Sequence, residues 1–109
     1  MHMAVFRFTV NKSFLEYNWH PITVPKSQVP YRALEAEGLS QRITIIFPQG
    51  ERLEGQLHYG PHSGFGEYYQ LQVRGADRTV PSYIKLHDRL LVALFKGGAR
   101  SYAVLENRE

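Results

Sequence analysis

Apolar and polar residues alternate one by one along most of this chain. In Val5–Val10, for example, Phe6, Phe8 and Val10 fall on one side of an extended backbone and the intervening residues on the other. This period of two predicts β-strands with one buried face. In an amphipathic helix, apolar residues would instead recur about every 3.6 residues. We expect strands at Val5–Val10, Ile22–Val24, Arg42–Phe47, Arg52–Tyr59, Tyr68–Val73, Arg89–Phe95 and Arg100–Leu105.

Helical signals are confined to two short segments, Pro30–Glu37 and Pro81–Leu86. In the first, Pro30 suits the opening turn and Gly38 stands just past the end. We therefore predict a mainly β fold, a seven-stranded open pseudobarrel with two short helices, because closure of a sheet removes its exposed edges.

The chain's 109 residues suffice for one domain with a single modest core, so we assign 1–109 to one domain. Its opening Met-His-Met, residues 1–3, is typical of a cloning remnant, and we interpret the chain as a fragment of a longer protein. No apolar run approaches the roughly 20 residues of a membrane helix, so no membrane partner is expected. The chain has no cysteine, which excludes internal disulfides and fits a reducing cytosol, the compartment we expect.

The formal net charge of +3 at pH 7 is mildly basic. Such a balance favours polyanionic partners, because phosphate contacts release counterions. A solubilising surface would account for the same charge.

Residue patterns typical of catalysis are scarce. His58 and His62 are separated by a Gly-Pro pair and cannot form a helical metal-binding pair. Glu51 and Glu54 belong to an expected hairpin turn, and Asp88 suits a turn before a strand. The sequence also lacks a nucleophile elbow and a phosphate-binding glycine loop. We therefore predict no catalytic residues, no metal and no cofactor.

Two segments interrupt the alternation, Asn11–Pro21 and Gly60–Gly66, and both are expected to be loops. Binding residues concentrate on loops that a rigid scaffold holds. Lysine neutralises phosphates, amides read base edges, and aromatic rings stack on bases. The candidate DNA-binding residues are Lys12, Ser13, Tyr17, Asn18, Trp19, His20 and Lys26 around the first segment, and Tyr59, His62, Ser63, Phe65 and Glu67 around the second.

Structural alternatives remain open for several of these residues. Trp19, with Phe14, could pack the first loop onto the barrel, and His62 and Ser63 could be simple turn residues. Glu67 could accept from a cytosine amino group or form a surface salt bridge.

Four segments occur in an informative order. Ile22-Thr23-Val24-Pro25-Lys26 precedes the first expected helix, and ITIIFPQGERLEGQLHYG forms an expected hairpin. GPHSGFGEYYQL follows, and Tyr83–Leu91 turns at Asp88 into a strand. In this order the segments resemble the B3 DNA-binding domain, best known from plant transcription factors, although the last is one residue shorter before its aspartate.

The resemblance implies a seven-stranded pseudobarrel that grips the DNA major groove with two arms, here 11–20 with Lys26 close behind, and 59–67. His87 stands where the plant pattern has glycine, and Arg74-Gly75-Ala76 replaces a tryptophan often found there. In these respects the chain is more similar to the bacterial B3-like target-recognition domains of restriction endonucleases. There the domain binds a short specific sequence and another domain cuts. The implied partners are double-stranded DNA and a nuclease domain of the same parent protein.

Other functions fit the same residues. A related pseudobarrel could bind RNA or a modified base, with Phe14, Tyr17 and Trp19 as an aromatic cage. A transcription-factor DNA-binding domain and a protein-interaction barrel are further alternatives. A small β-barrel enzyme would need a set of catalytic residues that this sequence does not show.

Overall fold

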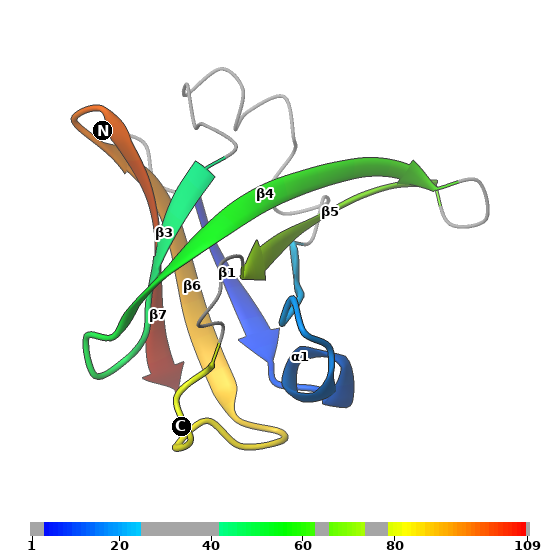
Figure 1. Ribbon diagram of the computed structural model, residues 1–109, viewed down its shortest axis with the longest axis vertical. Helices are drawn as coiled ribbons and strands as arrows, with labels where there is room; N and C mark the ends of the chain where they lie inside the picture. The colour runs from blue at the N-terminus through cyan, green and yellow to red at the C-terminus, as the bar shows by residue number, and fades with distance from the viewer. Residues whose placement is uncertain (1–3, 25–41, 63–65, 74–78, 109) are drawn as a thin grey trace.

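The computed structural model describes residues 4–24, 42–62, 66–73 and 79–108, and for 58–62, 66–69 and 108 it describes the backbone alone. Seven strands form one sheet in the order β1-β6-β7-β3-β4-β5-β2, and the two edge strands, β1 and β2, contact each other. The predicted mainly β, seven-stranded open pseudobarrel is confirmed: the structure is a nearly closed, barrel-like sheet (Figure 1). The elements are β1 (Ala4–Thr9), α1 (Lys12–Glu16), β2 (Ile22–Val24), β3 (Arg42–Ile46), β4 (Arg52–His62), β5 (Gly66–Val73), β6 (Arg89–Gly97) and β7 (Arg100–Arg108).

The alternation seen in the sequence becomes the inside and outside of the barrel. All neighbouring strands pair antiparallel except β3 and β7, which run parallel with Thr44 opposite Tyr102. In each strand one set of alternate, mainly apolar positions faces inward, and burial of that face drives the sheet to close. The buried core consists of Phe6, Phe8, Val10, Phe14, Ile22, Val24, Ile43, Ile45, Phe47, Leu57, Leu71, Val73, Ile84, Leu90, Val92, Leu94, Ala103 and Leu105.

The helices of the structure differ from the two that were predicted. The structure has a helix at α1, where a loop was expected, because the Asn11 side chain caps it and Phe14 packs into the core. The helix predicted at Pro81–Leu86 is wrong: this stretch forms turns, in which the Asp88 carboxylate accepts from the Lys85 N–H. The segment Pro30–Glu37 lies outside the described residues.

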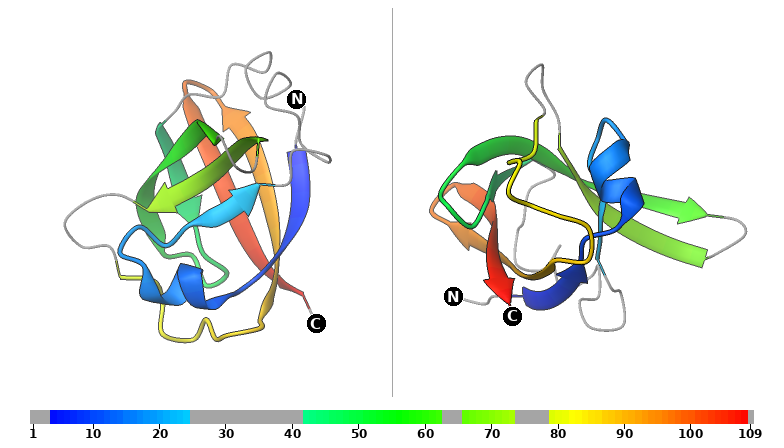
Figure 2. Two further views of the ribbon diagram at one scale, coloured as in Figure 1. Left: turned by 90° about the vertical axis from the view of Figure 1, so that its right-hand side faces the viewer. Right: turned by 90° about the horizontal axis from the view of Figure 1, so that it is seen from below.

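The loop predicted at Gly60–Gly66 is largely strand. β4 continues to His62 and β5 begins at Gly66, with Pro61 opposite Glu67 in an antiparallel ladder. The strand β3 pairs with β4 only as far as Gln56, so no described strand on that side needs the N–H that Pro61 lacks. The end of the hairpin therefore projects from the sheet as a two-stranded ribbon (Figures 1 and 2).

The connection between β1 and β2 joins the two edge strands of the sheet. The segment 11–21, which we call the arm, follows β1 at one edge of the sheet and leads into β2 at the other edge. It lies on the same side of the barrel as β2 and the projecting β4–β5 hairpin, which the left view of Figure 2 faces.

Candidate nucleic-acid interface

The arm is held in shape by its own hydrogen bonds. The Asn11 Oδ1 accepts from the Phe14 N–H at 2.8 Å, and the Tyr17 N–H donates to the Ser13 carbonyl at 3.0 Å. Phe14 is fully buried and meets Phe8 edge to face, with 5.5 Å between ring centroids. A five-residue helix is marginal alone, so the cap and the buried ring account for its formation.

His20 closes the arm. Its Nδ1 lies 2.7 Å from the Phe14 carbonyl oxygen, a contact in which the ring nitrogen donates, and its ring packs edge-on against Phe14. The backbone of His20 is left-handed, with φ of 42°. His20 thus has a structural part in the arm, while base reading by this residue stays a prediction.

A second set of contacts fixes the arm to the sheet. The Val73 N–H, at the end of β5, donates to the Trp19 carbonyl at 2.7 Å. The rings of Tyr17 and Trp19 lie 4.9 Å apart between centroids and are tilted by 32°. Their side chains are 47% and 39% exposed, so both rings present aromatic surface to solvent from an anchored backbone.

Between the arm and the sheet lies a recess of about 360 Å³, which we call the arm recess. The arm supplies its wall, and the outer faces of β2 and β5 supply its floor. Hydroxyl, amide and aromatic groups line it, and none of the described residues in its lining carries a formal charge. The lining residues are Asn11, Ser13, Tyr17, Trp19, Pro21, Thr23, Gln70 and Gln72.

The structure gathers some of the predicted site residues and separates others. Ser13, Tyr17 and Trp19 meet in the arm recess. Lys12 and Asn18 are exposed on the same arm without lining the recess. Tyr59, His62 and Glu67 lie by their backbone on the projecting hairpin, whereas Lys26, Ser63 and Phe65 lie outside the described residues.

Phe14 cannot form an aromatic cage with Tyr17 and Trp19, because its side chain is fully buried in the core. The predicted three-ring cage is therefore wrong. Its packing alternative is confirmed for Phe14, while the two remaining rings face the arm recess.

Sequence reasoning missed most of the floor. Thr23, Gln70 and Gln72 are the outward members of alternating strands, and the pattern assigned them to the outer face without marking a site. A signal was present, since two amides on one face of a strand are good groups for hydrogen-bonded recognition. Only the folded arm, however, turns that part of the outer face into a recess.

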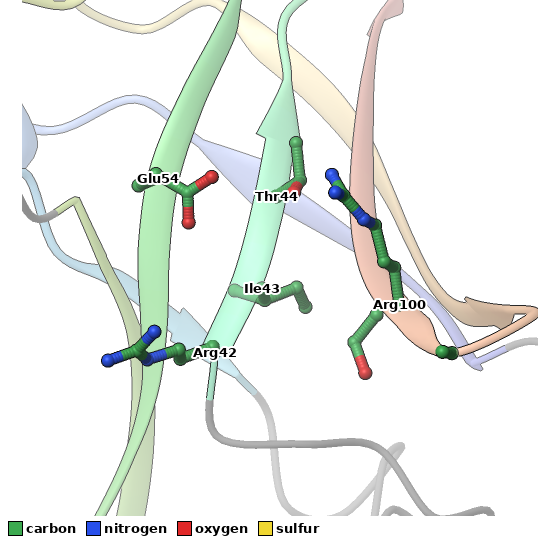
Figure 3. Close-up of a pocket in the computed structure, with 7 residues that line it drawn as sticks. Arg42, Ile43, Thr44, Glu54 and Arg100 are labelled. Carbon is green, nitrogen blue, oxygen red and sulfur yellow. The ribbon is translucent and has the colours of Figure 1, made fainter.

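A larger hollow of about 610 Å³ lies elsewhere, where β3 and β7 begin to separate. Glu54, Arg42 and Arg100 all line this hollow, so side chains of both charge signs surround it (Figure 3). Among the residues that the structure describes, its lining includes no aromatic residue and no residue of the arm. We therefore regard the arm recess as the better candidate for nucleic-acid recognition.

The residues that the structure describes also bear on metal binding and on membrane insertion. That part of the chain contains no group of three or more His, Cys, Asp or Glu side chains placed to hold a metal ion. Within the same residues, no helix has the length and apolar character needed to cross a membrane.

Comparison with known proteins adds no family assignment. No protein-family model matches this chain, and no curated protein matches it.

Proposed function

We propose that this domain binds double-stranded DNA sequence-specifically, with the arm and the β4–β5 hairpin on either side of a strand-built floor. The arm recess carries this proposal, because it combines anchored aromatic rings with hydrogen-bonding groups. Amide and hydroxyl groups discriminate base edges, whereas aromatic rings stack on bases or pack against sugars.

The projecting hairpin supplies the second half of the proposed grip. A two-stranded ribbon can enter a B-DNA major groove, whose width is about 12 Å. The hairpin and the arm lie on one side of the barrel, so both can approach one duplex (Figure 2). Phosphate contacts from exposed Lys12, and the net charge of +3, would add sequence-independent affinity.

The resemblance to target-recognition domains suggests the kind of protein in which this domain works. In a restriction endonuclease, this domain would select the sequence and a nuclease domain of the same protein would cut it. That division of labour requires no catalytic group in the present domain.

Selection from a random duplex DNA pool at near-physiological salt tests the proposal. We expect enrichment of one short motif by the wild-type protein, and loss of enrichment by the variant Trp19→Ala. Circular dichroism should show that the variant is folded. Failure of the folded wild-type protein to enrich any motif would contradict the proposal.

The exposed Tyr17–Trp19 pair also favours a second candidate, recognition of a modified or unpaired base by stacking. A competition assay separates the two. Preference for a duplex with a modified base, or for single-stranded RNA, over the selected plain duplex would favour the second candidate.

A further inference from the structure

Two glutamine side chains lie together on the floor of the arm recess. Gln70 and Gln72 alternate with buried Leu71 and Val73, so both amides are on the outer face of β5. The Nε2 of Gln72 donates to the Oε1 of Gln70 at 3.3 Å. Gln72 is only 9% exposed and Gln70 is half-buried, which places the amide pair partly out of water.

This hydrogen bond determines what the Gln70 amide can offer a ligand. An amide oxygen has two lone pairs, and the bond from Gln72 uses one of them. The other lone pair and the NH₂ group form an acceptor and a donor side by side. The adenine edge in the major groove matches them, with its N6 amino donor and its N7 acceptor. Guanine presents two acceptors there and cytosine one donor, so neither matches both.

Thr23 extends this match to the other base of the pair. It lies directly opposite Gln70 in the β2–β5 register, and its side chain is exposed on the same face of the sheet. A threonine methyl group packs well against the 5-methyl group of thymine. An A·T pair presents both features next to each other in the major groove.

From these contacts we infer that the arm recess reads an A·T base pair. Gln70 binds the adenine edge, Gln72 is a positioning residue that orients the Gln70 amide, and Thr23 contacts the thymine methyl group. This inference rests on the proposed function and deepens it, because it names the base pair that the recess selects.

The test compares motifs selected from a random duplex pool by the wild-type protein and four variants. Gln70→Ala should relax the preference at one A·T position, with a loss of affinity for the wild-type motif on the order of 10- to 100-fold. Gln70→Glu should shift that position towards C·G, because a carboxylate accepts from the cytosine amino group. Gln72→Met should relax the same position while the others remain, and Gln49→Ala, in an exposed turn, should change nothing.

Each result has a separate meaning. If the wild-type protein enriches no motif, the proposed function and this inference both fail. If it enriches a motif that folded Gln70→Ala and Gln70→Glu leave unchanged, the inference fails while DNA binding stands. A loss spread evenly over all positions in Gln72→Met would show a structural role for Gln72 and would overturn its positioning role.

Discussion

The backbone N–H of Val73 donates a 2.7 Å hydrogen bond to the carbonyl oxygen of Trp19, and so joins the end of β5 to the arm. The exposed Trp19 ring therefore stands on a fixed backbone although it lies in an irregular segment. Binding by a preorganised group avoids much of the entropy cost of ordering a loop. In the proposed complex with DNA, the geometry of the arm would therefore bear directly on affinity.

Loss of the arm's helix cap should weaken both stability and binding. The variant Asn11→Ala removes the oxygen that accepts from the Phe14 N–H, and we expect unfolding to become easier by about 1 kcal/mol. Urea denaturation measures this loss. Asn18→Ala, an exposed position on the same arm, serves as the control and should leave the unfolding midpoint unchanged.

Lys12 should contribute to DNA affinity without contributing to specificity. Lys12→Ala is expected to weaken binding to selected and scrambled duplexes alike and to reduce the slope of log K against log salt by about 1. Fluorescence titrations over a range of salt concentrations measure both quantities. Lys96→Ala, on β6, should leave the slope unaltered, and a change in selected motif on replacing Lys12 would refute its assignment to phosphate.

Gly55 is required by close packing between strands. A Cβ atom at this position would lie 2.6 Å from the Cδ1 of buried Ile45 and 3.1 Å from the Gln72 carbonyl oxygen. We expect Gly55→Ala to cost about 1–3 kcal/mol of unfolding free energy. In Gly97→Ala, the nearest atom would be on the half-buried Tyr102 ring at 3.2 Å, so the loss measured by thermal unfolding should be smaller.

The two histidines with left-handed backbone should respond oppositely to glycine. His87 has φ of 73°, and glycine adopts this conformation without steric cost, so His87→Gly should stabilise the protein by up to about 1 kcal/mol. His20→Gly also relieves strain but removes the contact with the Phe14 carbonyl and should destabilise. Equal thermal shifts in the two variants would contradict this account.

Tyr83 should make stability decrease at alkaline pH. Burial raises the pKa of its hydroxyl above 10.0, and the nearby Glu51 carboxylate adds to the increase, against a lowering by the Gln49 N–H. The folded state therefore holds the proton more tightly than the unfolded state. Its contribution to stability is complete below about pH 10 and is lost as the pH rises through the folded pKa.

The variant Tyr83→Phe isolates this effect. It removes a 2.8 Å hydrogen bond to Glu51, and we expect a loss of at most about 1 kcal/mol at neutral pH. Urea denaturation at about pH 8 and about pH 11 should show the gap between the two proteins narrowing at the higher pH. A gap that widens would show that Tyr83 favours its ionised form when folded.

The strands were predictable because alternation determines which face of each is buried. Phe6, Phe8 and Val10 fall in the core as expected, because only one side of an extended chain can be covered by the barrel. The helix α1 was missed since five residues are too few for helical periodicity, and its formation depends on a tertiary contact of Phe14.

The candidate site was harder to predict from the sequence than the strands were. Tyr17 and Trp19 stood out as aromatics outside the strand pattern, and the structure does bring them together. Gln70 and Gln72 follow the ordinary pattern of an outer strand face, and only the return of the arm over β2 and β5 encloses them. Similarly, Gly60 and Pro61 indicated a loop, yet cross-strand pairing extends the hairpin through both.

Because the arm connects β1 to β2, it has a structural role in the barrel besides its proposed role in binding. It spans the distance between the first and the last strand of the sheet, so the same residues that would meet DNA also draw the open edges of the barrel together. Substitutions in the arm that adapted it to a different DNA target would therefore also change the stability of barrel closure. In an evolving lineage, target preference and folding stability would be inherited as one coupled trait.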